Sequence, residues 1–216
     1  MSDSDQLQQL KSCSEPAFQE FYQIYASSIA AREQKSKAWI CEMVSNPNNK
    51  VLVMKRDGQV KGFSILFLPR SQSFGLLEYM AVTQEERNRG MGGELFRRSM
   101  ERARTPEGEA VPTLLEVDSD REESPDQSLR RRRQQFYRRL GCLRLAGLRY
   151  ILPLPGEGPP PEMDLMIYPA ANLREIQKSA LEKWLKTIYQ DVHRCPADDP
   201  RISKMLQGMP ETVKLE

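Results

Sequence analysis

The sequence is short of histidine, cysteine and ligand clusters, and each shortage excludes a class of chemistry. Its 216 residues include one histidine, His193, and four cysteines, which are Cys13, Cys41, Cys142 and Cys195. The cysteines lie far apart and form neither a Cys-x-x-Cys pair nor a Cys/His cluster. We therefore predict no metal site and no disulfide framework, and we expect the thiols to be unpaired, buried or incidental, in a reducing compartment. His193 lies too close in sequence to Cys195 for an easy nucleophile–base pair, so a general base would be a carboxylate, a water molecule or the substrate itself.

Long apolar stretches are also missing. No segment reaches the roughly 18 apolar residues that a membrane helix requires. The start, MSDSDQLQQL, is polar and acidic, whereas a secretory signal has a basic start and an apolar core. The sequence therefore predicts a cytoplasmic protein that contacts no membrane.

The net charge is only +2, but it is unevenly distributed along the chain. Residues 87–149 contain 15 arginines, no lysine and 10 acidic residues. Because arginine binds phosphate groups through forked hydrogen bonds, this segment predicts an anionic ligand. A phosphorylated cofactor and a nucleic acid are the two candidates. We expect no nucleic acid, because acids at 116–126 crowd the segment and no exposed aromatic residues are interleaved for base stacking.

The apolar pattern predicts a mixed α/β chain. Spacings of three and four residues predict helices over residues 18–29, 35–45, 93–104, 128–140 and 172–192. Short apolar runs between turn residues predict strands over residues 51–54, 60–68, 76–82, 113–117, 143–152 and 163–168. Asp57-Gly58 predicts a hairpin turn and Gly141 a helix C-cap. Asn172 and Glu175 form a capping-box pattern at the start of the last helix.

No change in composition marks a domain boundary. We therefore expect one domain over residues 1–170 and a C-terminal helical extension over residues 171–216 packed on it. The apolar stripe of the extension is wide enough to need a partner. Packing on its own domain and contact within a homodimer are the two alternatives.

A glycine-rich segment follows the third predicted strand. Gly90, Gly92 and Gly93 leave a backbone without side chains, so that successive N–H groups can turn toward an anion. The next helix aims the positive end of its dipole at the same place, and Arg87 and Arg89 add charge. The segment is neither a P-loop nor a G-x-G-x-x-G loop. The alternative is a glycine-rich turn that binds nothing.

Two motifs in this order resemble those of a known family. Arg87-x-x-Gly90-x-Gly92, directly after the strand at 77–82, resembles the acetyl-CoA loop Q/R-x-x-G-x-G/A of the GNAT superfamily of N-acetyltransferases. The sequence FYRRLG at residues 136–141 resembles the end of that family's next helix. The resemblance extends over roughly residues 7–168. It implies a partly splayed mixed α/β sheet of six to seven strands flanked by helices, with acetyl-CoA entering where strands 76–82 and 113–117 separate.

The resemblance also implies roles for individual residues. Tyr137 matches the family's tyrosine beside the thioester sulfur and would protonate the leaving thiolate. Glu78 is a candidate from the sequence itself: as the one acid in its apolar strand, it would accept the proton of the amine. Alternatives are a packing role for Tyr137 and a substrate-pairing role for Glu78. The expected cofactor-binding residues are Met80, Ala81, Val82, Arg87, Asn88, Arg89, Gly90, Met91, Gly92, Gly93 and Arg130. Arg130 departs from the family, which often has asparagine there. Expected acceptor-binding residues are Arg32, Glu33 and Tyr150, with residues 153–161 at the opposite rim.

The predicted activity is the transfer of an acetyl group from acetyl-CoA, as co-substrate, to a primary amine. The amine of a small molecule or a peptide would attack the thioester directly in a ternary complex, without a metal and without a covalent enzyme intermediate. The alternative is a non-catalytic acyl-CoA-binding regulatory module on the same fold.

Overall fold

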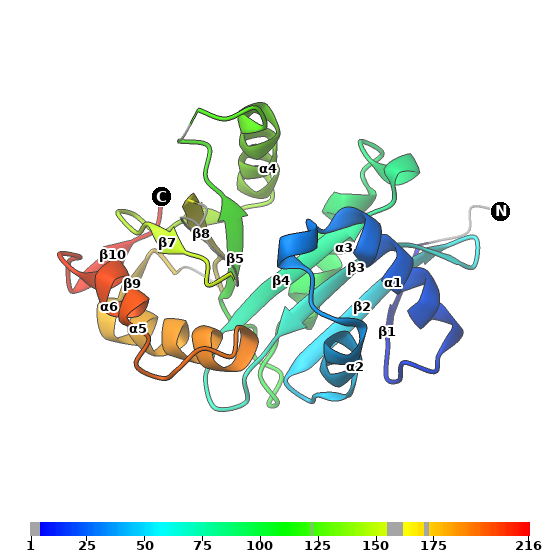
Figure 1. The fold of residues 1–216 in the computed structure, drawn as a ribbon, viewed down its shortest axis with the longest axis horizontal. Helices are drawn as coiled ribbons and strands as arrows, with labels where there is room; N and C mark the ends of the chain where they lie inside the picture. The colour runs from blue at the N-terminus through cyan, green and yellow to red at the C-terminus, as the bar shows by residue number, and fades with distance from the viewer. Residues whose placement is uncertain (1–4, 122, 155–161, 171–172) are drawn as a thin grey trace. The chain divides into compact units, whose positions relative to one another are not determined.

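The computed structural model describes residues 5–121, 123–154, 162–170 and 173–216 (Figure 1). The chain forms two compact units, Met1–Glu109 and Ala110–Glu216, each of which contains helices and strands. The predicted mixed α/β class is therefore confirmed.

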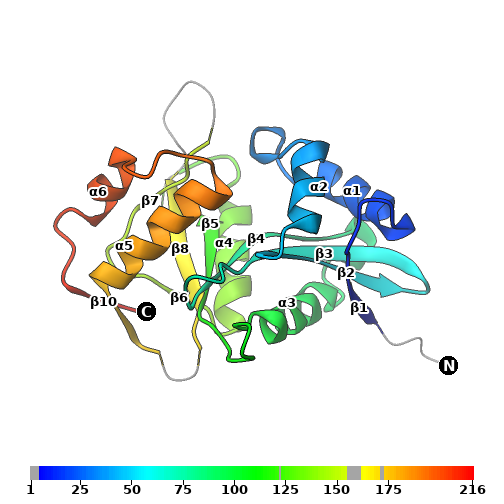
Figure 2. The same ribbon diagram turned by 90° about the horizontal axis from the view of Figure 1, so that it is seen from below.

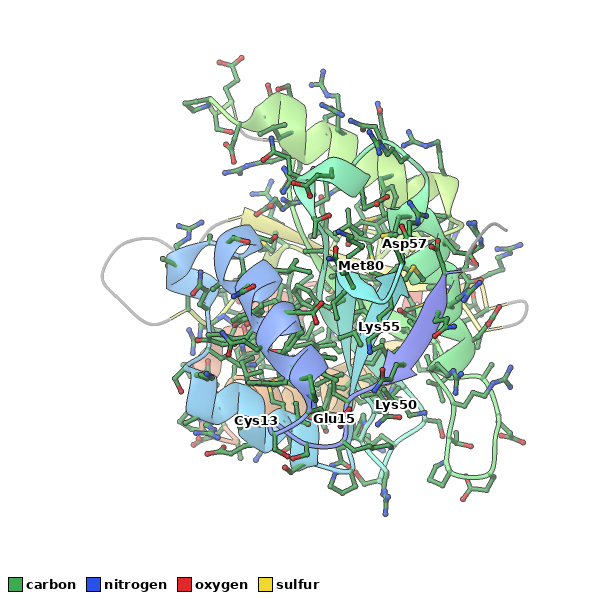
Figure 3. The ribbon with its side chains drawn as sticks, turned by 90° about the vertical axis from the view of Figure 1, so that its right-hand side faces the viewer. Cys13, Glu15, Lys50, Lys55, Asp57 and Met80 are labelled. Atoms are coloured by element: carbon green, nitrogen blue, oxygen red, sulfur yellow. A yellow bond between two sulfur atoms is a disulfide. The ribbon has the colours of Figure 1, made fainter. Side chains whose placement is uncertain are left out.

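The first unit is built on an antiparallel sheet in the order β1-β2-β3-β4. Its strands are β1 Gln6–Gln9, β2 Asn49–Arg56, β3 Gln59–Phe67 and β4 Gly75–Val82. Asp57 and Gly58, with φ of 52° and 76°, join β2 to β3. Positive φ at both central residues is the requirement of a type I′ hairpin turn, so the predicted turn is confirmed. Figure 3 labels Lys55 and Asp57 at this end of the hairpin.

Helices cover both faces of this sheet (Figure 2). They are α1 Pro16–Ser28, α2 Lys37–Ser45 and α3 Met91–Arg102, with short 3-10 turns η1 Ala31–Glu33 and η2 Gln84–Glu86. On the face covered by α1 and α2, Phe21 meets Phe63 of β3 edge-on, with ring centroids 5.0 Å apart. On the other face, Met54 of β2 packs with Met91 and Leu95 of α3. Because successive side chains of β2 point to opposite faces of the sheet, this strand contributes to the apolar core on each face.

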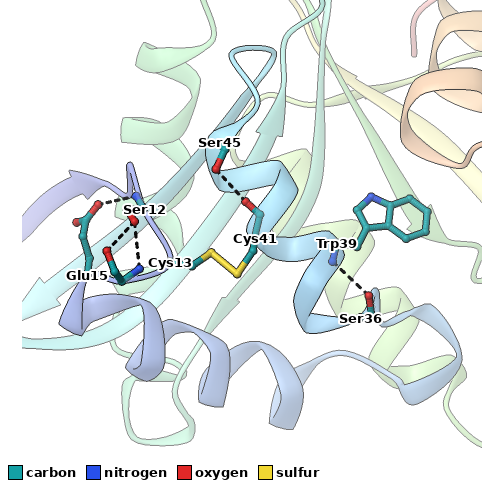
Figure 4. Close-up of a disulfide and its surroundings, with 8 residues drawn as sticks. Ser12, Cys13, Glu15, Ser36, Trp39, Cys41 and Ser45 are labelled. Carbon is teal, nitrogen blue, oxygen red and sulfur yellow. Dashed lines mark hydrogen bonds between the residues drawn. A yellow bond between two sulfur atoms is a disulfide. The ribbon is translucent and has the colours of Figure 1, made fainter.

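The prediction that all four thiols are unpaired is wrong for two of them. Cys13, which lies between β1 and α1, forms a disulfide with Cys41 of α2 (Figure 4). Their Cα atoms are 5.6 Å apart, within the usual range for a disulfide. The bond belongs to no local motif, because tertiary packing brings together residues 28 positions apart. The cysteine content therefore gives no support to a reducing compartment.

The second unit is built on strands that pair with one central strand. Its strands are β5 Thr113–Asp118, β6 Leu143–Arg144, β7 Tyr150–Ile151 and β8 Glu162–Tyr168, and β5, β6 and β7 all pair with β8 in antiparallel fashion. Helix α4, Gln127–Arg139, follows β5 and ends before Gly141, whose φ of 94° confirms the predicted C-cap. The single strand predicted over 143–152 is wrong. A turn with Gly147 at a φ of 75° divides it into β6 and β7.

The helix predicted over residues 172–192 starts later than expected. Glu175 is part of β9, Glu175–Gln177, which pairs with β10, Thr212–Lys214. Helix α5, Lys178–Thr187, follows and continues into a π-helical turn, η3 Ile188–Val192. The capping-box prediction therefore fails at Glu175, while Asn172 lies outside the described residues. The capping-box pattern is a local signal, whereas the strand conformation of Glu175 depends on pairing with a strand more than 30 residues away. Helix α6, Pro200–Leu206, was not predicted.

The C-terminal segment contacts other parts of the second unit. The hydroxyl of Tyr189 in η3 donates a hydrogen bond to the carbonyl of Ile151 in β7. The division into a domain over 1–170 and an extension over 171–216 remains a prediction. Within the described ranges, no helix is both long enough and apolar enough to span a membrane.

Removal of the disulfide should destabilise the protein. Closure of a loop of 28 residues reduces the entropy of the unfolded chain, and the chain-entropy relation gives about 3–4 kcal/mol. We expect Cys13→Ser to lower the free energy of unfolding by up to this amount in urea titrations without reductant. Cys41→Ser should match it, and dithiothreitol should destabilise only the wild type. Equal stability of all proteins in both conditions would contradict the disulfide.

Candidate functional site

The segment between β4 and α3 is an exposed turn that ends at a helix N-terminus. Asn88 and Gly90 have left-handed φ values of 62° and 88°, and residues 87–90 are exposed. Gly90 is the N-cap of α3, and as a glycine it has no side chain to accept a hydrogen bond from the first N–H groups of the helix. Gly92 and Gly93 lie in the first turn of the helix. The first N–H groups of a helix have no partner inside it. The start of α3 therefore presents backbone donors and the positive end of the helix dipole. Within the turn, the N–H groups of Arg87 and Arg89 already donate to the carbonyls of Gln84 and Glu86.

The space beside this turn is open. A Cβ atom placed on Gly90 would meet no heavy atom within 4 Å, so sterics does not require glycine there. The backbone conformation does require it, because a φ of 88° is rarely adopted by residues with side chains. The glycine therefore serves the path of the backbone.

A cluster of charges holds the turn in place. Glu86, which is buried just before the turn, accepts a hydrogen bond from Arg56 of β2 at 2.5 Å. The same guanidinium donates to both carboxylate oxygens of Asp5 at 2.8 Å, and Arg98 of α3 donates to the Asp5 carbonyl at 2.7 Å. Sequence analysis missed this cluster because its members come from four separate segments.

The strand before the turn contains a β-bulge. In the pairing of β3 with β4, Ile65 lies opposite Tyr79 and Leu66 lies opposite Leu77, so Glu78 is the residue that the register skips. Bulges re-aim side chains and are frequent beside active sites. As a result, two successive side chains of β4 reach the same neighbouring segment. Glu78 contacts Lys35, and the Tyr79 hydroxyl donates to the carbonyl of Glu33 at 2.7 Å.

Glu78 forms an ion pair with a lysine that sequence analysis did not identify. Lys35 Nζ contacts Glu78 Oε1, and the two side chains are only 8% and 3% exposed. The ammonium also lies 4.9 Å from the ring centroid of Trp39 and 5.7 Å from that of Tyr79, which are cation–π distances. The Lys35 N–H donates to the Tyr25 hydroxyl at 2.7 Å. The link between α1 and α2 is thus tied directly to β4.

The predicted acceptor-binding residues fall in both units. Arg32 and Glu33 lie in η1, three and two positions before Lys35, with Arg32 Nε 3.5 Å from Glu33 Oε1. Tyr150 lies inside the second unit, only 1% exposed, and donates a hydrogen bond to the Glu116 carboxylate. Residues 155–161 of the predicted rim lie outside the described residues. The acceptor roles remain predictions.

The second unit contains Tyr137, the predicted proton donor. It lies near the end of α4 beside Phe136, with ring centroids 5.2 Å apart. Desolvation raises the pKa of Tyr137 to about 12, although the positive charge of Arg133 opposes this shift. The hydroxyl therefore stays protonated at neutral pH and can donate a hydrogen bond.

The lone histidine forms part of a buried cluster that sequence analysis missed. His193 Nε2 lies 3.0 Å from Glu116 Oε1, the oxygen that also accepts from Tyr150. Burial, followed by the charge of Glu116, raises the pKa of Tyr150 well above its usual value. The residues come from β5, β7 and the end of η3, so no local spacing predicted them.

The free thiols are poorly suited to nucleophilic attack. Burial raises the pKa of the Cys142 thiol to about 12 and also raises that of Cys195. The thiolate is the reactive form, so both side chains favour the inert form. This agrees with the prediction of direct transfer. In the part of the chain that the structure describes, no group of three or more potential metal ligands occurs.

Three arginines of α4 have acidic partners. Arg130 Nε lies 3.0 Å from Asp126, Arg131 Nε lies 3.8 Å from Asp120, and Arg133 contacts Asp118. These pairs reduce the positive field that a nucleic acid would need. The expectation that no nucleic acid binds and the expected contact of Arg130 with a cofactor both stay predictions.

The comparisons define the class of protein. The model of the acetyltransferase (GNAT) family matches residues 8–142. The chain belongs to this family, as its two motifs predicted. None of the curated proteins matches the chain in sequence.

Solved structures share the fold. A protein from Bacteroides thetaiotaomicron assigned to the GNAT family has 19% identity and a TM-score of 0.71, covering 88% of this chain and 99% of its own. The ribosomal-protein-S18-alanine N-acetyltransferase from Escherichia coli has 16% identity and a TM-score of 0.57, covering 79% and 96%. A GNAT family acetyltransferase from Elizabethkingia anophelis with acetyl-CoA bound has 14% identity and a TM-score of 0.52, covering 77% and 99%.

The charge cluster beside the turn should make stability depend on pH. The hydrogen bonds from Arg56 hold the pKa of Asp5 below its usual value. A carboxyl group with a lowered folded-state pKa stabilises the protein above its unfolded value of about 3.9, and this contribution disappears as the pH falls through the folded value. We expect Arg56→Met to lower the thermal midpoint by several degrees at pH 6. The deficit should shrink below pH 4.

Arg97→Met is the matched control for this experiment. Arg97 is 55% exposed and pairs with Glu94 only along the surface of α3, so the thermal midpoint should change little. A deficit for Arg56→Met that stays constant from pH 6 to pH 2 would show that Asp5 does not depend on Arg56.

Proposed function

We propose that this protein transfers an acetyl group from acetyl-CoA to a primary amine by direct attack in a ternary complex. The observation that carries the proposal is the exposed turn at residues 87–90, whose bare backbone leads into the N-terminus of α3. Membership of the GNAT family and the acetyl-CoA bound to the Elizabethkingia anophelis relative support the choice of ligand.

In this proposal the turn holds the pyrophosphate of the cofactor. The amides of residues 88–93 donate hydrogen bonds to the phosphate oxygens, and the exposed Arg87 and Arg89 supply charge. The backbone of residues 80–82 in β4 pairs with the pantetheine arm as an added strand would. Arg130 is the remaining proposed contact, through a phosphate group.

The chemical step needs a neutral amine. A lysine-like amine has a pKa near 10.4, so a base must remove its proton before or during attack. We assign this role to Glu78, a buried carboxylate on the strand proposed to hold the thioester. The amine nitrogen forms a bond to the acetyl carbon, the C–S bond breaks, and Tyr137 gives a proton to the departing thiolate. Positioning of the two reactants supplies much of the remaining rate.

The acceptor is a primary amine of a small molecule or a peptide. The Escherichia coli relative is named for an alanine of a ribosomal protein, which supports a peptide amine as one class. Arg32 and Glu33, which lie next to the segment that contacts Glu78 and Tyr79, are the proposed contacts in the first unit. Tyr150 is the proposed contact in the second.

A non-catalytic acyl-CoA-binding module is the second candidate, and one observation favours it. The Glu78 carboxylate is already engaged by the ammonium of Lys35, and an ion-paired carboxylate is a weaker base. The two candidates differ in turnover. The enzyme releases free CoA in the presence of an accepted amine, whereas the module binds acetyl-CoA and releases none.

Binding of acetyl-CoA should depend on the turn. Titration calorimetry should detect binding to the wild type at tens of micromolar. Gly90→Ala should weaken it at least about tenfold, because an alanine at this φ costs about 1–2 kcal/mol and shifts the amides. Gly58→Ala is the matched control, with a φ of 76° and equally open space in the β2–β3 turn. Equal affinities of the two variants would rule out the turn as the binding site.

Tyr137→Phe should slow turnover without changing cofactor affinity. Loss of a proton donor typically costs about 100-fold or more in kcat. Because the pKa of Tyr137 is about 12, its hydroxyl stays protonated below pH 10, so the ratio of wild-type to variant rates should be constant from pH 6 to pH 10. An unchanged kcat would refute the proton-donor role, and a ratio that falls as the pH approaches 10, the usual tyrosine pKa, would refute the raised pKa.

A further inference from the structure

The first unit contains its own amine and carboxylate in contact. Lys35 Nζ lies against Glu78 Oε1, and both side chains are almost completely buried. An acyl acceptor needs an amine whose proton can be removed, and a hydrogen bond to a carboxylate provides a direct path for that proton. The pair therefore has the two groups that N-acetylation requires on the acceptor side.

The surroundings of the pair hold the amine in one place. The ring centroids of Trp39 and Tyr79 lie 4.9 Å and 5.7 Å from Lys35 Nζ. The hydrogen bond from the Lys35 N–H to Tyr25 fixes the backbone of the same residue. A lysine side chain normally loses conformational entropy when it is positioned for reaction. In this protein the contacts already restrict the Lys35 side chain, so the entropy cost of positioning it is smaller.

The pair also lies beside the proposed thioester site. Met80, where the proposed pairing with the pantetheine arm begins, is two residues beyond Glu78 on β4. Two residues of strand span about 7 Å. The Lys35 ammonium, which contacts Glu78, is thus held close to the strand segment proposed to bind the thioester.

We propose that Lys35 is an acetyl acceptor, so that the protein acetylates itself at this residue. The inference rests on the proposed function, because acetyl-CoA supplies the acetyl group. One proton of the ammonium passes to Glu78, and the nitrogen lone pair forms a bond to the acetyl carbon. The C–S bond breaks and its electron pair leaves with sulfur, so that CoA departs as a thiolate. The nitrogen loses a second proton as the amide forms, and the thiolate takes up this proton.

The modification would change the site. An acetylated lysine carries no charge, so both the ion pair with Glu78 and the cation–π contacts with Trp39 and Tyr79 disappear. The segment that joins α1 to α2 therefore loses its electrostatic attraction to β4. Acetylation therefore alters the segment that carries the proposed acceptor contacts, Arg32 and Glu33.

The chain offers a matched control lysine. Lys37 lies two residues further on, is exposed, and has its Nζ 5.4 Å from the ring centroid of Tyr22 and 5.9 Å from that of Phe18. Like Lys35, it therefore lies beside two aromatic rings, although these are different rings. Uncatalysed acetylation by acetyl-CoA favours accessible amines, so it would modify Lys37 before the buried Lys35.

The experiment incubates the full chain with isotopically labelled acetyl-CoA and locates the label by peptide mass spectrometry. We expect one labelled acetyl group on Lys35, formed with a half-time that does not change over a tenfold range of protein concentration. Lys35→Arg should abolish the labelling and keep the positive charge, and Lys37→Arg should leave it unchanged. Glu78→Gln should slow labelling by about 100-fold or more. Glu78→Asp, which keeps the carboxylate, serves if the glutamine variant does not fold.

The outcomes separate this inference from the proposed function. Label on Lys37 and other exposed lysines, with Lys35 unmodified, overturns self-acetylation. Acetylation of added amines without label on Lys35 also overturns it and leaves the proposed function intact. Failure to bind acetyl-CoA in calorimetry overturns both.

Discussion

The buried contact between Lys35 and Glu78 is the constraint on which the candidate site depends. Burial of two charges is costly, and loss of one partner leaves the other uncompensated. The structure offsets this cost by surrounding the ammonium with the rings of Trp39 and Tyr79 and by placing Glu78 on a β-bulge. The bulge, the link between α1 and α2, and the start of α2 must therefore form together. Because these are the segments proposed to hold the thioester and the acceptor amine, the ion pair couples the fold to the chemistry.

Features that depend on a few consecutive residues could be predicted from the sequence. The Asp57-Gly58 turn and the Gly141 cap both follow from positive φ values, which one or two residues determine. Features that depend on distant partners could not. Glu175 lies in a capping-box pattern, yet it forms a strand because residues 212–214 lie alongside it. The disulfide likewise depends on the packing of α2 against the segment between β1 and α1, which no spacing of cysteines expresses.

The candidate site divides in the same way. The backbone turn was predictable because its chemistry lies in consecutive residues, and Glu78 stood out as the one acid in an apolar strand. Lys35 did not, because a single lysine at the start of a helix is indistinguishable in sequence from a solvated one. His193 was considered only beside Cys195, its neighbour in sequence, whereas the structure joins it to Glu116, 77 residues away. Partners of charged residues are set by tertiary structure, and periodicity carries no information about them.

Charge content alone does not show which part of the arginine-rich segment 87–149 would bind an anion. Arginines are numerous in α4, yet three of them contact aspartates that precede or begin the same helix. Arg97 and Arg98 contact Glu94 within α3. An arginine that already has a carboxylate partner must lose that contact to bind a phosphate, which cancels part of the gain. The first backbone N–H groups of α3 have no partner inside the helix. The start of α3, rather than the more highly charged α4, is therefore the better candidate for an anion site.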